Sequence, residues 1–155
     1  MTQEEKQLLL KDLCARLPYH GLICQTNKGK GTLISVECSF GEDLVYVDFG
    51  RSEAEEFDLN DGDTVKPYLR PMSSMTEEEQ EEFGNLVGLW KYNCGGSIRF
   101  VNHLPNLSGE FAKTLVSEII IANAIDWLNK HHFDFRGLIE EGLALESPED
   151  MYKIG

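Results

Sequence analysis

Basic residues are scarce in this sequence. The 155 residues include 14 Lys and Arg against 27 Asp and Glu, which gives a formal net charge of −13. Proteins that hold nucleic acid through its phosphates need clustered Lys and Arg. The charge therefore argues against direct nucleic-acid binding, although it permits a basic protein partner or mimicry of a nucleic acid. The simplest interpretation is an acidic surface that keeps the protein in solution.

Cysteines are few and widely separated, at Cys14, Cys24, Cys38 and Cys94. The absence of any CxxC pair argues against a structural zinc site, and a chain of this length needs no disulfide framework. Cys14 and Cys38 lie in apolar patterns and are interpreted as small core residues. We therefore expect reduced thiols and a cytoplasmic protein.

Long uninterrupted apolar runs are also missing. A membrane-spanning helix needs about 20 mostly apolar residues, and Glu118 and Asn123 interrupt the most apolar stretch. At the N-terminus, Glu4 and Glu5 precede only a few leucines before Lys11, which is not the pattern of a secretory signal peptide. We expect no membrane segment.

The stretch 108–135 carries the strongest helical signals. Ser108 can cap its first turn, and apolar residues recur at spacings of three and four on several faces. A helix that is apolar nearly all round is buried on several sides or shared with another chain. The sequence predicts one long buried helix over 108–132, in which Ile120 and Trp127 would be interface residues if a second chain binds there.

The earlier part of the chain predicts a helix followed by a sheet. The sequences TQEE at 2–5 and TEEE at 76–79 have the form of capping boxes. They predict an N-terminal helix that ends at Pro18 and covers a sheet, and a short acidic helix that ends near Gly84.

Between residues 22 and 70 the apolar period changes to two, which indicates short strands. The residues expected to point inward are Ile34, Val36, Cys38, Phe40, Val45, Val47, Phe49, Phe57 and Leu59. Such a meander predicts a small antiparallel sheet curled into a partly open barrel. Pro67 and Pro71 predict an unpaired connector over 65–75, and the pattern further suggests a strand at 97–101 and a short helix from Leu138 to Gly142.

One conspicuous polar cluster, His131, His132, Asp134 and Arg136, follows the predicted long helix. His131 and Asp134 have the spacing of a helical metal-ligand pair, but two ligands are too few for a site. The favoured interpretation is that the histidines supply positive charge at the end of the helix, and that Asp134 pairs with Arg136. The sequence assigns no catalytic residue, metal or cofactor, and this cluster is its candidate functional site.

Other motifs are weaker. Residues 27–32 superficially resemble a phosphate loop but lack its glycine spacing and predict a hairpin turn instead. Ser73 and Ser74 lack the GxSxG context of a serine nucleophile. Cys94, with His103 nearby, has no third orienting group and is a poor candidate nucleophile.

Three blocks of sequence carry a resemblance. They are TQEEKQLLL with DL and RLPY within 2–19, VKPYLRPMSSMTEE at 65–78, and DWLNKHHFDFRGLI with GLALE and MY within 126–152. Together they resemble a family of small uncharacterised proteins encoded by gut anaerobic bacteria, their prophages and other mobile elements. The resemblance implies a phage or mobile-element origin and a cytoplasmic setting, and it implies no catalytic residue.

These observations predict a single α+β domain over 1–155, with a helix and β-meander in 1–75 and a mainly helical part in 76–155. The predicted function is a non-enzymatic interaction module of a phage or mobile element, which binds a protein partner or a second copy of itself. The alternatives are an acidic nucleic-acid mimic that binds a basic host protein, and a hydrolase that uses the region of His131 and Asp134.

Overall fold

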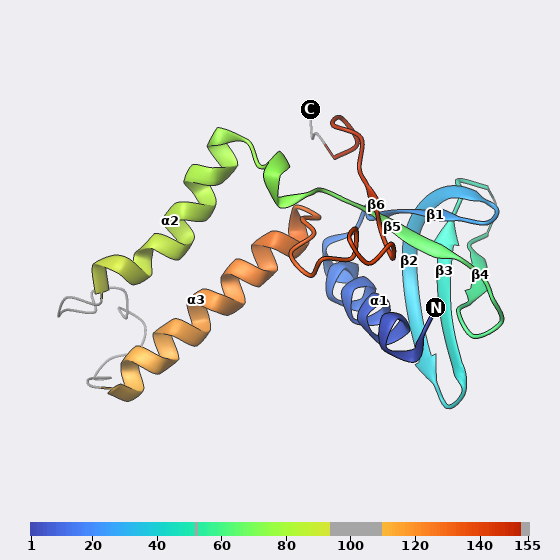
Figure 1. Cartoon of the computed structure of the whole chain (residues 1–155), viewed down its shortest axis with the longest axis horizontal. Helices are drawn as coiled ribbons and strands as arrows, with labels where there is room; N and C mark the ends of the chain where they lie inside the picture. The colour runs from blue at the N-terminus through green and yellow to red at the C-terminus, as the bar shows by residue number, and fades with distance from the viewer. Residues whose placement is uncertain (52, 94–109, 153–155) are drawn as a thin grey trace. The chain divides into compact units, whose positions relative to one another are not determined.

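The computed structural model describes residues 1–51, 53–93 and 110–152, and the side chains of 87–118 are outside the description. It confirms an α+β architecture that begins with a helix (Figure 1). The chain forms two compact units, one made of Met1–Ser74 with Asn129–Gly155 and the other of Met75–Leu128. The residues after 128 therefore belong with the N-terminal unit rather than with the preceding helices.

The elements follow one another in this order: α1 (Gln3–Arg16), a 3-10 turn (Leu17–Tyr19), β1 (Ile23–Thr26), β2 (Gly29–Ser39), β3 (Glu42–Asp48), β4 (Glu55–Asp58), β5 (Val65–Leu69), a second 3-10 turn (Met72–Ser74), α2 (Glu77–Asn93), α3 (Glu110–Lys130) and β6 (Leu145–Glu146).

The described strands form one mixed sheet in the order β4-β3-β2-β1-β5-β6. Neighbours from β4 to β5 are antiparallel, whereas β6 lies parallel to β5. The predicted barrel is wrong, because β4 and β6 are the two edges of an open sheet. Strand β6 has only two residues, and it pairs with a strand about 75 positions earlier in the sequence. Two residues are too few to show the apolar–polar alternation that identifies a strand, so the sequence does not predict it.

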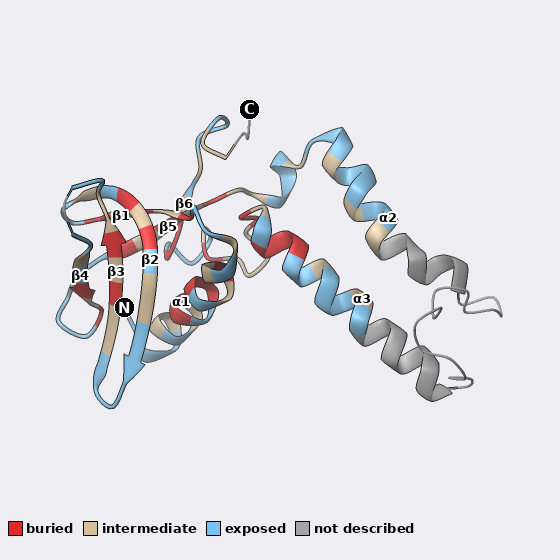
Figure 2. Ribbon diagram, turned by 180° about the vertical axis from the view of Figure 1, so that it is seen from behind, coloured by how far each residue is buried: buried red, intermediate tan, exposed pale blue. Residues whose placement is uncertain are grey.

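Helix α1 covers the sheet, as predicted. Its capping box is present, since the Thr2 hydroxyl accepts from the Glu5 amide while the Glu5 carboxylate accepts from the Thr2 amide. The buried apolar residues of α1 are Leu9, Leu10 and Leu13, and they share one core with strand residues. Figure 2 shows this buried layer in red. Burial of apolar surface, rather than helix propensity, is what fixes a helix of this length in place.

Strands β2 and β3 form a long hairpin whose inward pattern changes along β2. The pairing of β2 with β3 shifts register between Leu33 and Ser35, so Ile34 is an extra residue in β2. Beyond such a bulge, the positions of β2 that point towards the core change from odd to even residue numbers. Leu33 is buried while Ile34 is 51% exposed.

Four inward assignments are wrong, and the bulge accounts for one of them, Ile34. Ile34, Cys38 and Phe40 are exposed on β2 and its turn, and so is Cys14 on α1. Val45, Val47 and Phe57 are fully buried, as predicted.

The connector predicted at 65–75 is wrong over its first part, because Val65–Leu69 is strand β5. Pro67 stands opposite Cys24 of β1, while β6 pairs only with Tyr68 and Leu69 in the described residues. A proline lacks an amide donor and fits a strand only where none is needed. In the described residues, β6 does not pair with Pro67, so no amide donor is needed there on the β6 side of β5.

The helices of Met75–Leu128 also differ from prediction. The capping box at Thr76 and Glu79 is present, but α2 continues through Gly84 to Asn93. Most of the described α3 side chains from 119 to 126 are exposed, and only the stretch 127–129 is buried. The prediction of one long buried helix is therefore wrong for residues 119–126 (Figure 2).

Two remaining predictions concern shorter segments. The short helix expected from Leu138 is instead a series of turns between Gly137 and Gly142. Ser108, Cys94, His103 and the strand expected at 97–101 lie outside the described residues.

Two glycines offer a matched test of the packing. A Cβ on Gly31 would lie 2.6 Å from the Asp48 carbonyl oxygen and 2.6 Å from a Val47 methyl, whereas one on Gly84 would meet nothing within 4 Å. We expect Gly31→Ala to lower the free energy of unfolding by about 1–3 kcal/mol through overpacking. Gly84→Ala should instead raise helix stability by about 0.5–1 kcal/mol.

Denaturant and thermal unfolding followed by circular dichroism measure both effects. Equal stability of Gly31→Ala and the unmodified protein would contradict the close approach of β2 to β3.

Candidate functional site

The predicted polar cluster lies in the segment that leaves α3 and returns to the sheet. After α3 ends at Lys130, the backbone turns at His132, whose φ is +58°. The segment then pairs with the end of β5: the Arg70 amide donates to the His132 carbonyl (2.8 Å), and the Asp134 amide donates to the Arg70 carbonyl (2.8 Å). The cluster is thus fixed beside β5 through its backbone.

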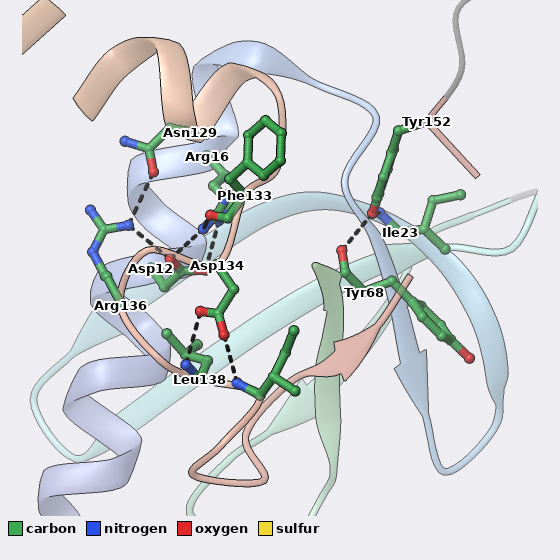
Figure 3. Close-up of polar contacts among 11 residues, drawn as sticks. Asp12, Arg16, Ile23, Tyr68, Asn129, Phe133, Asp134, Arg136, Leu138 and Tyr152 are labelled. Carbon is green, nitrogen blue, oxygen red and sulfur yellow. Dashed lines mark hydrogen bonds and ion pairs between the residues drawn. The ribbon is translucent and has the colours of Figure 1, made fainter. Parts of the chain in front are cut away.

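A buried ion network lies beneath this segment. Asp12 and Arg16, four residues apart on α1, are both fully buried. Arg16 Nε donates to Asp12 Oδ2 (2.7 Å), and Arg16 Nη2 donates both to Asp12 Oδ1 (2.8 Å) and to the Phe133 carbonyl (2.8 Å). Arg136 Nη1 donates to Asp12 Oδ1 (2.8 Å) and to Asn129 Oδ1 (3.0 Å). Figure 3 shows these contacts.

We refer to Asp12, Arg16, Asn129 and Arg136 as the Asp12 network. It joins α1 to the segment that carries the predicted cluster. One carboxylate receives two guanidinium groups, so the network itself holds a net positive charge. The ring of Phe135 lies beneath Arg136, whose guanidinium carbon is 4.2 Å from the ring centroid. A cation over an aromatic face is further stabilised by the ring quadrupole.

Asp134 does not form the predicted ion pair with Arg136. Its two carboxylate oxygens accept hydrogen bonds from the amides of Leu138 and Ile139, each at 2.9 Å. A carboxylate at this place satisfies backbone donors at the start of a turn. The prediction is wrong because the partner of Arg136 is Asp12, which lies 124 positions away in the sequence.

His132 is a buried neutral residue rather than a cation at the end of a helix. Its side chain packs on Tyr152 with 4.4 Å between the ring centroids, and the residue is 5% exposed. Burial, together with smaller effects from the charges of Arg16 and His131, lowers the pKa of His132 to about 4. Among the described residues its Nδ1 atom has no hydrogen-bond partner.

Tyr152 joins the last described residues to the sheet through two hydrogen bonds. Its hydroxyl donates to the Tyr68 carbonyl (2.8 Å) and accepts from the Ile23 amide (3.1 Å), which bridges β5 and β1 (Figure 3). Burial raises the pKa of this hydroxyl well above its ordinary value. Tyr152 is therefore a neutral structural contact at physiological pH.

The arrangement does not make a metal centre. Within the described ranges, no group of three or more His, Cys, Asp or Glu side chains could hold a metal ion. An open hollow of about 490 Å³ lies elsewhere, around the start of α1 and the β2–β3 turn. Its lining residues are Gln3, Lys6, Cys38, Ser39, Phe40, Gly41, Asp43 and Asn60.

Sequence reasoning found the segment but missed its buried partners. The structure brings His132, Asp134 and Arg136 close to α1, where Asp12 and Arg16 were not recognised as part of the cluster. A signal was present: an Asp and an Arg four residues apart among the apolar residues of an amphipathic helix indicate a pair that is buried together.

The two predicted interface residues occupy different surroundings. Trp127 is 7% exposed and contacts Phe83, with 5.2 Å between the ring centroids. Ile120 is half-buried. Among the α3 side chains that the structure describes, the large exposed apolar ones are Ile119, Ile121 and Ile125.

The chain matches no protein-family model, and it has no significant match among the curated proteins or the solved structures compared. Among the described residues, no helix combines the length and the apolar character that crossing a membrane requires.

The Asp12 network predicts an asymmetric response to mutation. Asp12→Asn leaves two guanidinium groups without a countercharge, one of them fully buried, and should lower the free energy of unfolding by about 3–5 kcal/mol. The exposed pair of Lys28 and Glu55 supplies a control, because Glu55→Gln should change stability far less. Urea denaturation of both variants measures the difference, and equal losses would show that Asp12 is not a buried partner.

His132 predicts a pH dependence of stability. Its pKa is 6.5 when unfolded and about 4 when folded, so the unfolded chain binds the proton more tightly. The resulting stabilisation is complete above about pH 6.5 and is lost as the pH falls towards 4. It amounts to about 3 kcal/mol.

Urea denaturation between pH 4 and 7 tests this dependence. His132→Asn, which tolerates the positive φ, should remove the part of the pH dependence of the unfolding free energy that His132 contributes. His20→Asn, at an exposed position, should retain it. If the unfolding free energy of His132→Asn depended on pH as that of the unmodified protein does, His132 would not be the source of this dependence.

Proposed function

We propose that the protein is a non-enzymatic interaction module that binds a basic protein partner through exposed apolar residues of α3. The observation that carries the proposal is the contrast between two regions. Within the part of the chain that the structure describes, His132, Asp134 and Arg136 of the predicted cluster are engaged inside the fold, whereas large apolar side chains on α3 face solvent.

Three isoleucines within seven positions of α3 support a contact surface. Ile119 is 43% exposed, Ile121 is 58% exposed and Ile125 is 37% exposed. Ile121 and Ile125 are four residues apart and so share one face of the helix. Clustered exposed apolar side chains in a folded protein indicate a binding surface more often than isolated ones do.

Charge favours a basic partner over a second copy. Two identical chains would each carry a formal charge of −13, which opposes their association. The unit Met75–Leu128, to which these isoleucines belong, has eight acidic and three basic residues. A partner with positive charge around an apolar contact would meet both properties.

The hydrolase alternative has less support. The alternative uses the region of His131 and Asp134, and a general base must reach the proton that it removes from a substrate. Asp134 has both oxygens engaged by backbone amides and the neighbouring His132 ring is buried against Tyr152, so neither of these two side chains has that freedom. The proposal also includes a phage or mobile-element origin and a cytoplasmic setting, which rest on the three sequence blocks described above.

The apolar surface can be tested directly. Purified protein would be used to capture partners from a lysate of a gut anaerobic bacterium, alongside the double variant Ile121→Ser/Ile125→Ser. Ile34→Ser, at an exposed position of β2, is the matched control. We expect the α3 variant to recover at least about tenfold less of one basic protein, because apolar contacts at the centre of an interface dominate affinity.

The other outcomes contradict the proposal in distinct ways. Capture of a basic protein that is abolished by salt but indifferent to the α3 variant would favour the acidic mimic. Sedimentation of the purified protein as a dimer, lost in the α3 variant, would favour self-association. Recovery of no partner above the level of the control bait would count against an interaction module.

A further inference from the structure

The sheet has an outer face, on the side away from the core that α1 shares. Cys24 of β1 and Val65 and Leu69 of β5 point into that core and are buried. Successive side chains of a strand point to opposite faces, so the residues that alternate with these three point outward. They are only partly buried, and β1 and β5 thus offer an outer face to solvent.

Lysines lie on both sides of one glutamine on this outer face. Gln25 of β1 stands opposite Lys30 of β2 and, on its other side, opposite Lys66 of β5. Residues directly opposite one another in antiparallel strands share a face. Because neighbouring strands are about 4.8 Å apart, the two lysines start from backbone positions about 10 Å apart. Tyr68, two positions after Lys66, lies on the same face, and we refer to these four residues as the lysine face.

Three contacts fix the arrangement of the lysine face. The Tyr68 hydroxyl donates to Gln25 Oε1 (3.1 Å), while Gln25 Nε2 donates to the Thr26 carbonyl (3.0 Å). Lys30 Nζ lies over the Tyr68 ring, 4.6 Å from the ring centroid, where the ring quadrupole attracts a cation. The Lys30 ammonium group is thus held at one place, which reduces the conformational entropy that it loses when a ligand binds.

The positive charge of the lysine face is not neutralised locally. In the part of the chain that the structure describes, neither Lys30 nor Lys66 forms an ion pair. Lys28, in the neighbouring turn, is by contrast paired with Glu55. The chain has only 14 Lys and Arg and a formal charge of −13, yet two lysines stand together here without a carboxylate. Such a surface is the electrostatic complement of an anionic ligand.

We propose that the lysine face binds an acidic peptide segment of a protein partner, whose carboxylates pair with Lys30 and Lys66. The inference rests on the strand register that brings the two lysines together and on charge complementarity. It goes beyond the proposed function, because it uses a different surface of the protein and a partner group of the opposite charge.

A nucleic-acid strand fits the lysine face less well. Proteins hold single strands partly by stacking bases on aromatic rings, but Lys30 Nζ lies over one face of the Tyr68 ring and Gln25 engages its hydroxyl. Two lysines neutralise few phosphates, and the affinity of a protein for nucleic acid depends on that number. The net charge of −13 also repels a long polyanion. A short acidic segment needs only the two lysine contacts.

Fluorescence anisotropy tests the proposal, with a fluorescein-labelled oligoglutamate peptide titrated with the full chain at low salt. We expect Lys30→Gln/Lys66→Gln to bind the peptide about fivefold more weakly than the unmodified protein, because two exposed ion pairs are lost. Added salt should weaken binding to the unmodified protein, since it screens exposed charges. Circular dichroism would check that each variant keeps the fold.

The matched control is Lys11→Gln/Lys28→Gln, which removes the same charge from outside the lysine face. Lys11 is exposed on α1, and Lys28 is already paired with Glu55. This control should bind the peptide as the unmodified protein does. So should Ile121→Ser/Ile125→Ser, which makes failure of this proposal distinguishable from failure of the α3 surface.

Several results would overturn the proposal. They are no binding of the oligoglutamate peptide, equal binding of a neutral oligoserine peptide, or an equal loss of affinity in the control variant. Tighter binding of an oligothymidylate than of the oligoglutamate peptide would assign the lysine face to nucleic acid instead.

Discussion

The structure depends on one carboxylate that has been removed from water together with a guanidinium group. Burying an ion costs several kcal/mol unless its partners replace the lost water. Asp12 receives Arg16 from its own helix and Arg136 from a distant segment, while Arg16 also reaches the Phe133 carbonyl. Removing one partner while the others stay buried would leave a charge uncompensated, so the network requires α1 and the segment after α3 to pack in one arrangement.

The same place gathers the three sequence blocks described above. The first contains α1 with Asp12 and Arg16, the second contains β5 and Arg70, and the third contains the segment from Asn129 to Tyr152. The backbone pairing of Arg70 with this segment and the hydroxyl of Tyr152 on β5 complete the assembly. This arrangement gives the three blocks a structural role, because they specify how three separate pieces of chain pack together.

What could be predicted from the sequence was local. Both capping boxes, a hairpin turn within 27–32 and the inward residues of β3 follow from patterns within a few positions, although the turn itself takes only 27–28. The exposure of Ile34 required knowledge of a bulge, which depends on the pairing of β2 with β3. Two other features arise from contacts between residues that are far apart in the sequence. One is the pairing of β5 with β6, and the other is the ion pair of Arg136 with Asp12 rather than with Asp134. No periodicity encodes such contacts.

The order of the pieces along the chain has a consequence for synthesis on the ribosome. Met75–Leu128 is an insertion between two halves of one unit, and the bonds that complete the Asp12 network join residues 117 and 124 positions apart. A nascent chain that ends before Arg136 can form α1 and the β2–β3 hairpin. It must, however, keep the part of α1 that carries Asp12 hydrated until Phe133 and Arg136 emerge from the exit tunnel.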